Sequence, residues 1–187
     1  ILKELKSKKK IYGFDSFKGL NNFNKNDKFR LFNDQFKKKE INKKNFQDHK
    51  KLVKFKILQL QRSVNPKNIS TSLDFTNSNL KLLKKKIKYL RLNNIIIIKG
   101  NFKNSLLNKK IPFKKLMAVN MDCDLYESYN QVLLTIHGFL SKNSMVNLDE
   151  YYSLKFPGPR KSVNEFLKKN KSFLLKSFNK KFCFPRY

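Results

Sequence analysis

Glycine, cysteine and acidic residues are scarce in this chain of 187 residues. It has five glycines, and no GxGxxG motif or other glycine-rich loop follows a predicted strand. Its two cysteines, Cys123 and Cys183, form no CxxC pair and no Cys/His cluster, which argues against a zinc site and against a disulfide framework. Two reduced thiols are typical of a cytoplasmic protein.

Long hydrophobic runs and nucleophile motifs are also missing. No apolar run approaches the roughly 18 residues that a membrane span needs, and no N-terminal stretch has the pattern of a signal peptide. The sequence contains no GxSxG and no cysteine close to a histidine. His137 falls inside an amphipathic helical pattern, which indicates a packing or surface role, whereas His49 stays a candidate acid or base. We therefore expect a cytoplasmic protein with no membrane partner.

The charge is strongly one-sided, with 43 Lys and Arg against 13 Asp and Glu and a net charge of +30. Such a charge suits a module that binds RNA or another anionic surface. Coding bias is the other interpretation, because Lys, Asn, Ile and Phe are abundant while Ala, Gly and Trp are scarce or absent. The lysines spread over most of the chain, so they favour bias over a nucleic-acid partner. A salt titration separates the two, since phosphate binding weakens steeply with salt.

Strand and helix patterns alternate along the chain. The sequence opens with a helix end at 1–10, has a long, partly helical excursion at 21–60 and ends in a hairpin tail at 172–187. Strands are predicted at 11–15, 95–100, 116–121 and 144–150, and helices at 80–90, 127–140 and 159–170. Within the excursion, 52–60 has the pattern of a helix, although its alternation also suits a strand. This order predicts an open α/β fold with a mostly parallel sheet, in which ligands bind beyond the carboxyl ends of the strands.

The scarce acids gather at two of those strand ends. The stretch MDCDLYES, residues 121–128, supplies Asp122 and Asp124, and NLDEYY, residues 147–152, supplies Asp149 and Glu150. Oxygen ligands are what Mg²⁺ prefers, and carboxylates packed this closely repel one another unless a cation lies between them. Helix capping is the competing interpretation for Asp124, but capping explains one acid and not the whole set. The pattern predicts a site for a divalent cation.

Five stretches in order resemble one protein family: IYGFDSFKGL, IIIIKGNFKNSL, MAVNMDCDLYESY, VNLDEYY and GPRKSVNEF. Together they are similar to the TylF/macrocin O-methyltransferases, which are S-adenosylmethionine-dependent and Mg²⁺-dependent sugar methyltransferases. The resemblance extends over 11–166 and implies a Rossmann-like class I methyltransferase sheet that ends in an antiparallel hairpin. It also implies a sugar or related polyol as the small-molecule partner, with a homo-oligomer as one option.

The resemblance also assigns roles to particular residues. Asp122, Asp149 and Glu150 fall on the metal positions, and Asp122 or Asp124 is the candidate general base for the sugar hydroxyl. The residues assigned to the cofactor are Asp15, Ser16, Gly100, Asn101 and Phe102. Tyr151 and Arg160 fall where substrate is bound, and Arg160 has the alternative role of bracing the lid.

The chain departs from the family pattern in several places. The family usually has Asp–Asp where this chain has Asp149–Glu150, and a Pro-Gly-Gly turn where it has Lys142, Asn143 and Ser144. The family's first strand and glycine-rich loop precede GFDSF and are not among these residues. We therefore expect one methyltransferase-like domain, residues 1–187, that is a fragment with a lid-like insertion at 21–60.

The missing strand has a consequence for the sheet. The strands at 11–14 and 116–121 flank it in the family, so they should either leave unpaired backbone and an unstable chain or pair directly. In both cases we expect poor binding of S-adenosylmethionine. The alternatives to an active O-methyltransferase are a non-catalytic remnant of the fold and a basic binding module.

Overall fold

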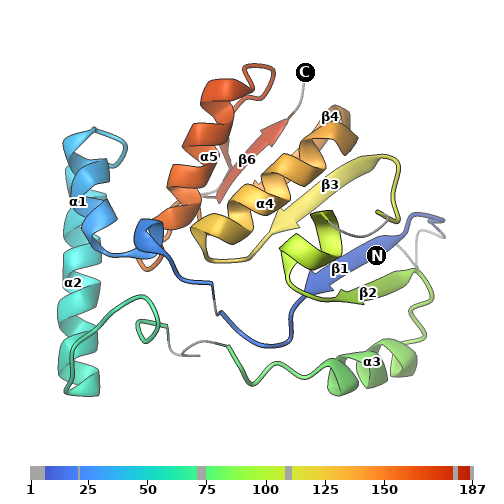
Figure 1. Cartoon of the computed structure of the whole chain (residues 1–187), viewed down its shortest axis with the longest axis horizontal. Coiled ribbons are helices and arrows are strands. Elements are labelled where there is room, and N and C mark those ends of the chain that lie inside the picture. The colour runs from blue at the N-terminus through green and yellow to red at the C-terminus, as the bar shows by residue number, and fades with distance from the viewer. Residues whose placement is uncertain (1–6, 21, 71–74, 108–110, 179–180, 186–187) are drawn as a thin grey trace. The chain divides into compact units, whose positions relative to one another are not determined.

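The computed structural model of the chain describes residues 7–20, 22–70, 75–107, 111–178 and 181–185 (Figure 1). The chain divides into two compact units, Ile1–Gly19 with Phe75–Lys110 and Leu20–Asp74 with Ile111–Tyr187. The helix end predicted at 1–10 falls largely on residues 1–6, which lie outside the described residues, and residues 7–10 are not helical. The expectation of a single domain with a lid-like insertion stays a prediction.

The first unit is built on two parallel strands, β1 (Ile11–Asp15) and β2 (Ile95–Lys99). They pair in register from Ile11 opposite Ile95 to Asp15 opposite Lys99. Four consecutive β-branched isoleucines favour the extended conformation of β2. Helix α3 (Leu80–Tyr89) precedes β2, and a helical turn, η2 (Lys103–Leu107), follows it. Strands β1 and β2 and helix α3 lie where the sequence pattern predicts strands at 11–15 and 95–100 and a helix at 80–90.

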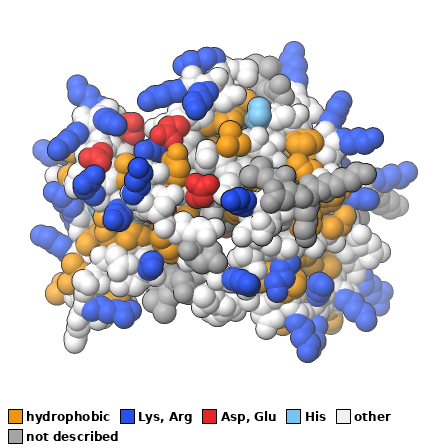
Figure 2. Space-filling view, in the orientation of Figure 1, with side chains coloured by type: hydrophobic (Ala, Val, Ile, Leu, Met, Phe, Trp, Pro, Cys, Tyr) orange, Lys and Arg blue, Asp and Glu red, His pale blue; other side chains and the backbone are white. Residues whose placement is uncertain are grey.

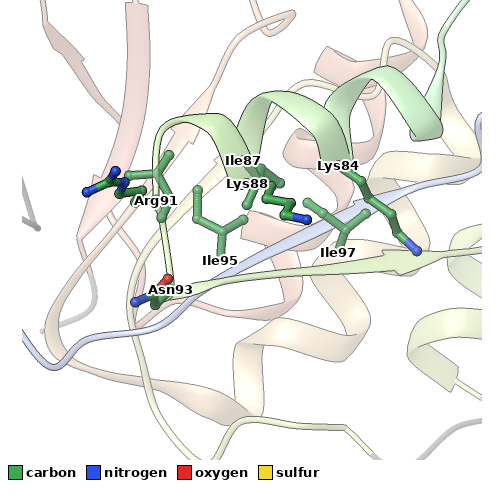
Figure 3. Close-up of a pocket in the computed structure, with 8 residues that line it drawn as sticks. Lys84, Ile87, Lys88, Arg91, Asn93, Ile95 and Ile97 are labelled. Atoms are coloured by element: carbon green, nitrogen blue, oxygen red, sulfur yellow. The ribbon is translucent and has the colours of Figure 1, made fainter.

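Helix α3 packs loosely beside β2. None of its residues is fully buried, and a groove of about 460 Å³ lies against it, floored by Ile87, Ile95 and Ile97. Figure 3 shows the side chains of Lys84, Lys88 and Arg91 around this floor. The predicted apolar face of this helix is therefore only partly covered within the described residues.

The second unit contains a four-stranded sheet in the order β3-β4-β6-β5. Strands β3 (Leu116–Met121) and β4 (Leu140–Leu148) are parallel, and β6 (Lys181–Pro185) runs antiparallel to β4 and to β5 (Lys176–Phe178). The predicted C-terminal hairpin is thereby confirmed. A register shift between β3 and β4 accommodates extra residues of β4, among them Asn143, whose φ of 68° is left-handed where the family usually has glycine.

Helices α4 (Tyr126–Ile136) and α5 (Gly158–Lys169) pack against each other beside this sheet (Figure 1), and the short turn η3 (His137–Phe139) joins α4 to β4. The core combines apolar side chains of both helices and of β4: Leu133, Ile136, Val146, Leu148, Val163 and Phe166. The helical spacing over 127–140 predicts five inward positions. Four of them are buried, namely Val132, Leu133, Ile136 and Leu140, whereas Phe139 is half-buried.

The excursion at 21–60 forms a short turn, η1 (Lys25–Asp27), and two helices, α1 (Arg30–Lys37) and α2 (Lys43–Leu60). Helix α2 is confirmed but begins nine residues before the predicted 52–60, because the Asn42 side chain caps it by accepting from the Asn45 N–H. The Asn- and Lys-rich composition conceals this beginning in the sequence.

Strands β1 and β3 belong to separate sheets in the two units, and no strand within the described residues pairs with both. The direct pairing that was one of the two expected outcomes is therefore not formed there. Low stability and weak cofactor binding stay predictions.

Asp27 connects the beginning of α4 to the excursion. Its buried carboxylate accepts from the Tyr126 N–H at 2.8 Å and from the Asn24 N–H at 3.0 Å. Leu125, at the N-cap of α4, offers no side-chain cap, so Asp27 replaces it from 99 residues away. Gly158 packs so closely that a Cβ there would meet Asp27 Oδ1 and the backbone N of Tyr126.

We predict that Gly158→Ala destabilises the protein by about 1–3 kcal/mol, because a methyl group overpacks a contact that includes backbone. Gly138→Ala is the matched control, since nothing lies within 4 Å of a Cβ at that position. Urea unfolding of both variants checks this. Equal midpoints for the two variants would contradict the close contact at Gly158.

Candidate active site

The carboxyl ends of β3 and β4 lie at the same edge of the sheet. The two strands are parallel, with Met121 opposite Leu148, and the Asp149 N–H donates to the Met121 carbonyl at 3.1 Å. The residues directly after each strand are therefore neighbours. Asp122, Asp149 and Glu150 each place one carboxylate oxygen within 4.8 Å of the others. The predicted convergence of these three acids is confirmed.

The donor set fits a hard divalent cation. Oxygen ligands at about 2.1 Å from Mg²⁺ lie at most about 4.2 Å apart, so only a small closure of the cluster is needed. All three donors are carboxylate oxygens, which suit Mg²⁺, Mn²⁺ or Ca²⁺ better than softer metals. Asp122 and Asp149 are exposed to solvent, whereas Glu150 is buried. That these residues hold a cation stays a prediction.

Burial and mutual repulsion shape the electrostatics of the cluster. Desolvation, followed by the charges of Asp124 and Asp122, raises the pKa of Glu150 to about 9. Desolvation and the charge of Asp122 raise the pKa of Asp124 to about 7, although Lys155 opposes the change. The carboxylates therefore resist carrying full negative charge together, and a bound cation would offset that repulsion.

Asp124 has an unusual backbone conformation at this edge, with a φ of 55°. Asp is one of the few residues other than glycine that adopt the left-handed region without large cost. The Asp124 carboxylate is half-buried and close enough to the exposed Asp122 for the charge of Asp122 to raise the pKa of Asp124. A role of Asp124 as a base stays a prediction.

The predicted cofactor residues come together at the carboxyl ends of β1 and β2. The Gly100 N–H donates to the Asp15 carbonyl at 2.9 Å, so the two strand ends are adjacent. The Asp15 carboxylate accepts from the Phe17 N–H, and the Ser16 hydroxyl accepts from the Lys18 N–H at 3.1 Å, which shapes the turn after β1. The groove beside α3 lies elsewhere, because its lining includes Asn93 and Ile95 at the amino end of β2.

Two further predicted cofactor residues follow Gly100. Asn101 accepts from the Asn104 N–H at 2.9 Å and so begins the helical turn at 103–107, and Phe102 is half-buried. Gly100 has a φ of 154°, a conformation that residues with a side chain rarely adopt. A cofactor role for these residues stays a prediction.

Arg160 is 1% exposed and contacts the helices of the excursion. Its guanidinium donates to Gln35 Oε1 at 3.1 Å and to Asn45 Oδ1 at 3.5 Å, and it lies over the rings of Tyr151 and Tyr152. Of its two predicted roles, this geometry favours bracing α1 and α2 over direct contact with substrate. Half-buried Tyr151 donates to Asn164 at 2.8 Å, and its substrate role stays a prediction.

His49 is packed and not presented to solvent. Its ring stacks on Phe32 at 3.8 Å between centroids, and Nδ1–H donates to the Leu154 carbonyl at 2.8 Å. Desolvation, with a smaller effect of Lys50, lowers the pKa of the imidazole. These contacts tie α2 to the segment after Glu150, which is a structural task.

The distribution of the basic side chains can be followed on one face of the molecule. Figure 2 shows lysine and arginine side chains scattered over the visible face instead of gathered in one groove. Among the described residues, no helix has the length and apolar character that a bilayer crossing requires. The scattered charge agrees with coding bias better than with a nucleic-acid interface.

Two solved structures share this fold. The O-methyltransferase NovP aligns with a TM-score of 0.66 and 17% identity, over 100% of this chain and 63% of NovP. CalS11, a calicheamicin methyltransferase, aligns with a TM-score of 0.60 and 18% identity, over 95% of this chain and 60% of CalS11. The predicted class, an α/β methyltransferase fold with mostly parallel strands, is confirmed. The chain spans about three fifths of the length of each similar structure.

The family follows from the sequence match. The model of the macrocin-O-methyltransferase (TylF) family matches residues 68–173, more than half of the chain, and the chain therefore belongs to this family. A search of curated proteins by sequence finds no match. The matched segment contains all three acids of the cluster as well as Gly100 and Arg160.

Acidification should cost stability through His49. Because burial lowers its pKa in the folded state, the unfolded state binds a proton first as the pH falls below about 6.5. The contribution of neutral, buried His49 to the free energy of unfolding is intact above that pH. It is lost as the pH falls toward the pKa that His49 has in the folded state. We predict that His49→Gln, which can still donate to Leu154, loses less stability than the parent between pH 7.5 and about 5.

Unfolding free energies measured across this range test the prediction as a difference between variants, which removes the contribution of the titrating carboxylates. His137→Gln is the matched control, because it makes the same substitution at an exposed side chain. Parallel curves for the parent and His49→Gln would show that the pKa of His49 is not lowered in the folded state.

Proposed function

We propose that this protein is an S-adenosylmethionine-dependent, Mg²⁺-dependent O-methyltransferase that acts on a hydroxyl of a sugar or related polyol. The observation that carries the proposal is the cluster of Asp122, Asp149 and Glu150, within 4.8 Å of one another inside the segment that matches the family. NovP and CalS11 are methyltransferases, which supports methyl transfer. The match to the macrocin-O-methyltransferase family supports an oxygen atom as the acceptor.

Each part of the cluster has a task in this reaction. S-adenosylmethionine, when bound, supplies an activated methyl group on a sulfonium. The methyl group would pass to the acceptor oxygen with the thioether as leaving group, and a carboxylate of this chain would take the hydroxyl proton. A sugar hydroxyl is a poor nucleophile, so a cation held by the three acids would orient it and lower its pKa. Asp124, half-buried beside Asp122, is the favoured proton acceptor.

The residues at the ends of β1 and β2 are assigned to the cofactor. Asp15 offers a carboxylate for ribose hydroxyls, and Gly100 and Phe102 border the expected adenine position. Positioning supplies most of the rate in a displacement of this kind. We place the acceptor near Tyr151, while Arg160 acts through α1 and α2.

The proposal is tested by a methyl-transfer assay of the protein. Labelled S-adenosylmethionine is incubated with nucleotide sugars and glycosides, with and without EDTA. Mg²⁺-dependent label in a sugar supports the proposal. Absence of cofactor binding would indicate a non-catalytic remnant, and salt-sensitive RNA binding without methyl transfer would indicate a basic binding module.

Cation binding is predicted to depend on the cluster. Asp122→Asn should weaken Mn²⁺ or Mg²⁺ binding more than about tenfold, since even changes outside the ligand set cost about 10–100-fold. Asp34→Asn removes the same charge from α1, outside the cluster, and is the control. Calorimetric titration measures both. Equal affinities in the two variants would show that Asp122 does not bind the cation, and the proposed role of the cluster would be wrong.

Asp124→Asn separates base catalysis from cation binding, since Asn also tolerates the left-handed backbone at this position. If Asp124 takes the proton, kcat should fall by about 10²–10⁴ while the variant keeps its cation. Steady-state kinetics combined with cation titration checks this. An unchanged kcat would transfer the role of base to Asp122.

A further inference from the structure

The hydroxyl of Tyr129 lies between the ends of β3 and β4. Tyr129 sits in the first turn of α4, and its side chain is completely buried. The hydroxyl oxygen is 2.9 Å from the Met121 carbonyl, 3.1 Å from Glu150 Oε2 and 3.2 Å from the Glu150 backbone N. One side chain therefore contacts the last residue of β3 and both the backbone and the carboxylate of Glu150.

The pattern of donors shows which bonds the hydroxyl can make. The Glu150 N–H donates to the hydroxyl oxygen, which leaves the single hydroxyl proton for an acceptor. The Met121 carbonyl already accepts from the Asp149 N–H at 3.1 Å. That carbonyl has a second lone pair and can accept from the hydroxyl as well, whereas within the described residues the Tyr129 hydroxyl is the one hydrogen-bond donor to the Glu150 carboxylate. The bond from the hydroxyl to Glu150 Oε2 and the bond from the Glu150 N–H to the hydroxyl close a ring between Tyr129 and Glu150.

We propose that Tyr129 is a positioning residue that holds Glu150 in the orientation needed to bind the cation. The inference rests on the proposed function, because it concerns the same cluster. A glutamate side chain has more rotatable bonds than an aspartate, so a free carboxylate would lose more freedom when it binds a metal. The bond from Tyr129 fixes Oε2 in advance and leaves the other oxygen for the cation. Hydrogen bonds of this kind orient carboxylate ligands in metal sites.

This role gives a reason for glutamate at position 150, where the family usually has aspartate. The additional methylene carries the carboxylate to the Tyr129 hydroxyl. An aspartate at the same backbone position would end closer to the main chain and would fall short of that bond. The glutamate and the tyrosine thus act as a pair.

The test is the affinity for Mn²⁺, measured by electron paramagnetic resonance on the same chain without cofactor or acceptor. Tyr129→Phe removes only the hydroxyl and should weaken binding by about 10–100-fold. Tyr126→Phe is the matched control, because that tyrosine lies on the same helix and donates to Glu165, outside the cluster, at 2.7 Å. Its affinity for Mn²⁺ should equal that of the parent.

A second substitution, at Glu150, distinguishes positioning of Glu150 from a purely structural role of Tyr129. In the Glu150→Asp background the shorter side chain no longer reaches Tyr129, so adding Tyr129→Phe should change Mn²⁺ affinity by less than about threefold, well below the expected single effect. An equal loss in both backgrounds would overturn the inference. Should Tyr129→Phe fail to fold, Glu150→Asp alone decides, since a tenfold or greater loss supports the pair and undiminished affinity contradicts it.

The failure of this inference differs from the failure of the proposed function. If Asp122→Asn leaves Mn²⁺ affinity unchanged, the cation site itself is wrong. If Asp122→Asn weakens binding but Tyr129→Phe does not, the site stands and Tyr129 has no part in positioning Glu150.

Discussion

The candidate site depends on the parallel pairing of β3 with β4. Parallel strands end at the same edge, so the residues after Met121 and after Leu148 become neighbours although they are far apart in the sequence. The Asp149 N–H bond to the Met121 carbonyl extends the pairing just beyond the strands. Shifting β4 by one residue would turn Val146 and Leu148 out of the core and separate the acids, so core packing and site geometry are fixed together.

The surroundings of the cluster are held by buried polar contacts. Asp27 caps α4 from the excursion, and Arg160 is enclosed by Gln35, Asn45 and two tyrosine rings. Burying the guanidinium of Arg160 is costly unless its N–H groups have hydrogen-bond acceptors. These contacts therefore keep α1 and α2 in one arrangement beside α5. Through Arg160 these contacts also hold Tyr151 and Tyr152, which directly follow Glu150, and this suits a reaction that depends mainly on positioning.

Much of the fold and of the candidate site could be predicted from the sequence, because the signals are local. They are the run of isoleucines in β2, the helical spacing of Val132, Leu133 and Ile136, and the acids that follow two strands. Tyr129 was missed because a tyrosine in an apolar helical pattern is indistinguishable from core until its hydroxyl has a partner 21 residues away. The cap from Asp27 was missed because its partner lies 99 residues away. The separate sheets of β1 and β3 reflect long-range pairing, which no local pattern encodes.

The central claim is that Asp122, Asp149 and Glu150 together bind one divalent cation. Anomalous diffraction from crystals of the protein grown with Mn²⁺ tests it most directly, because Mn²⁺ takes the oxygen ligands that Mg²⁺ prefers. The account predicts a single strong peak bonded to one oxygen of each of the three carboxylates, with the Tyr129 hydroxyl still on the second oxygen of Glu150. A peak elsewhere, or one that leaves Glu150 out, would contradict it.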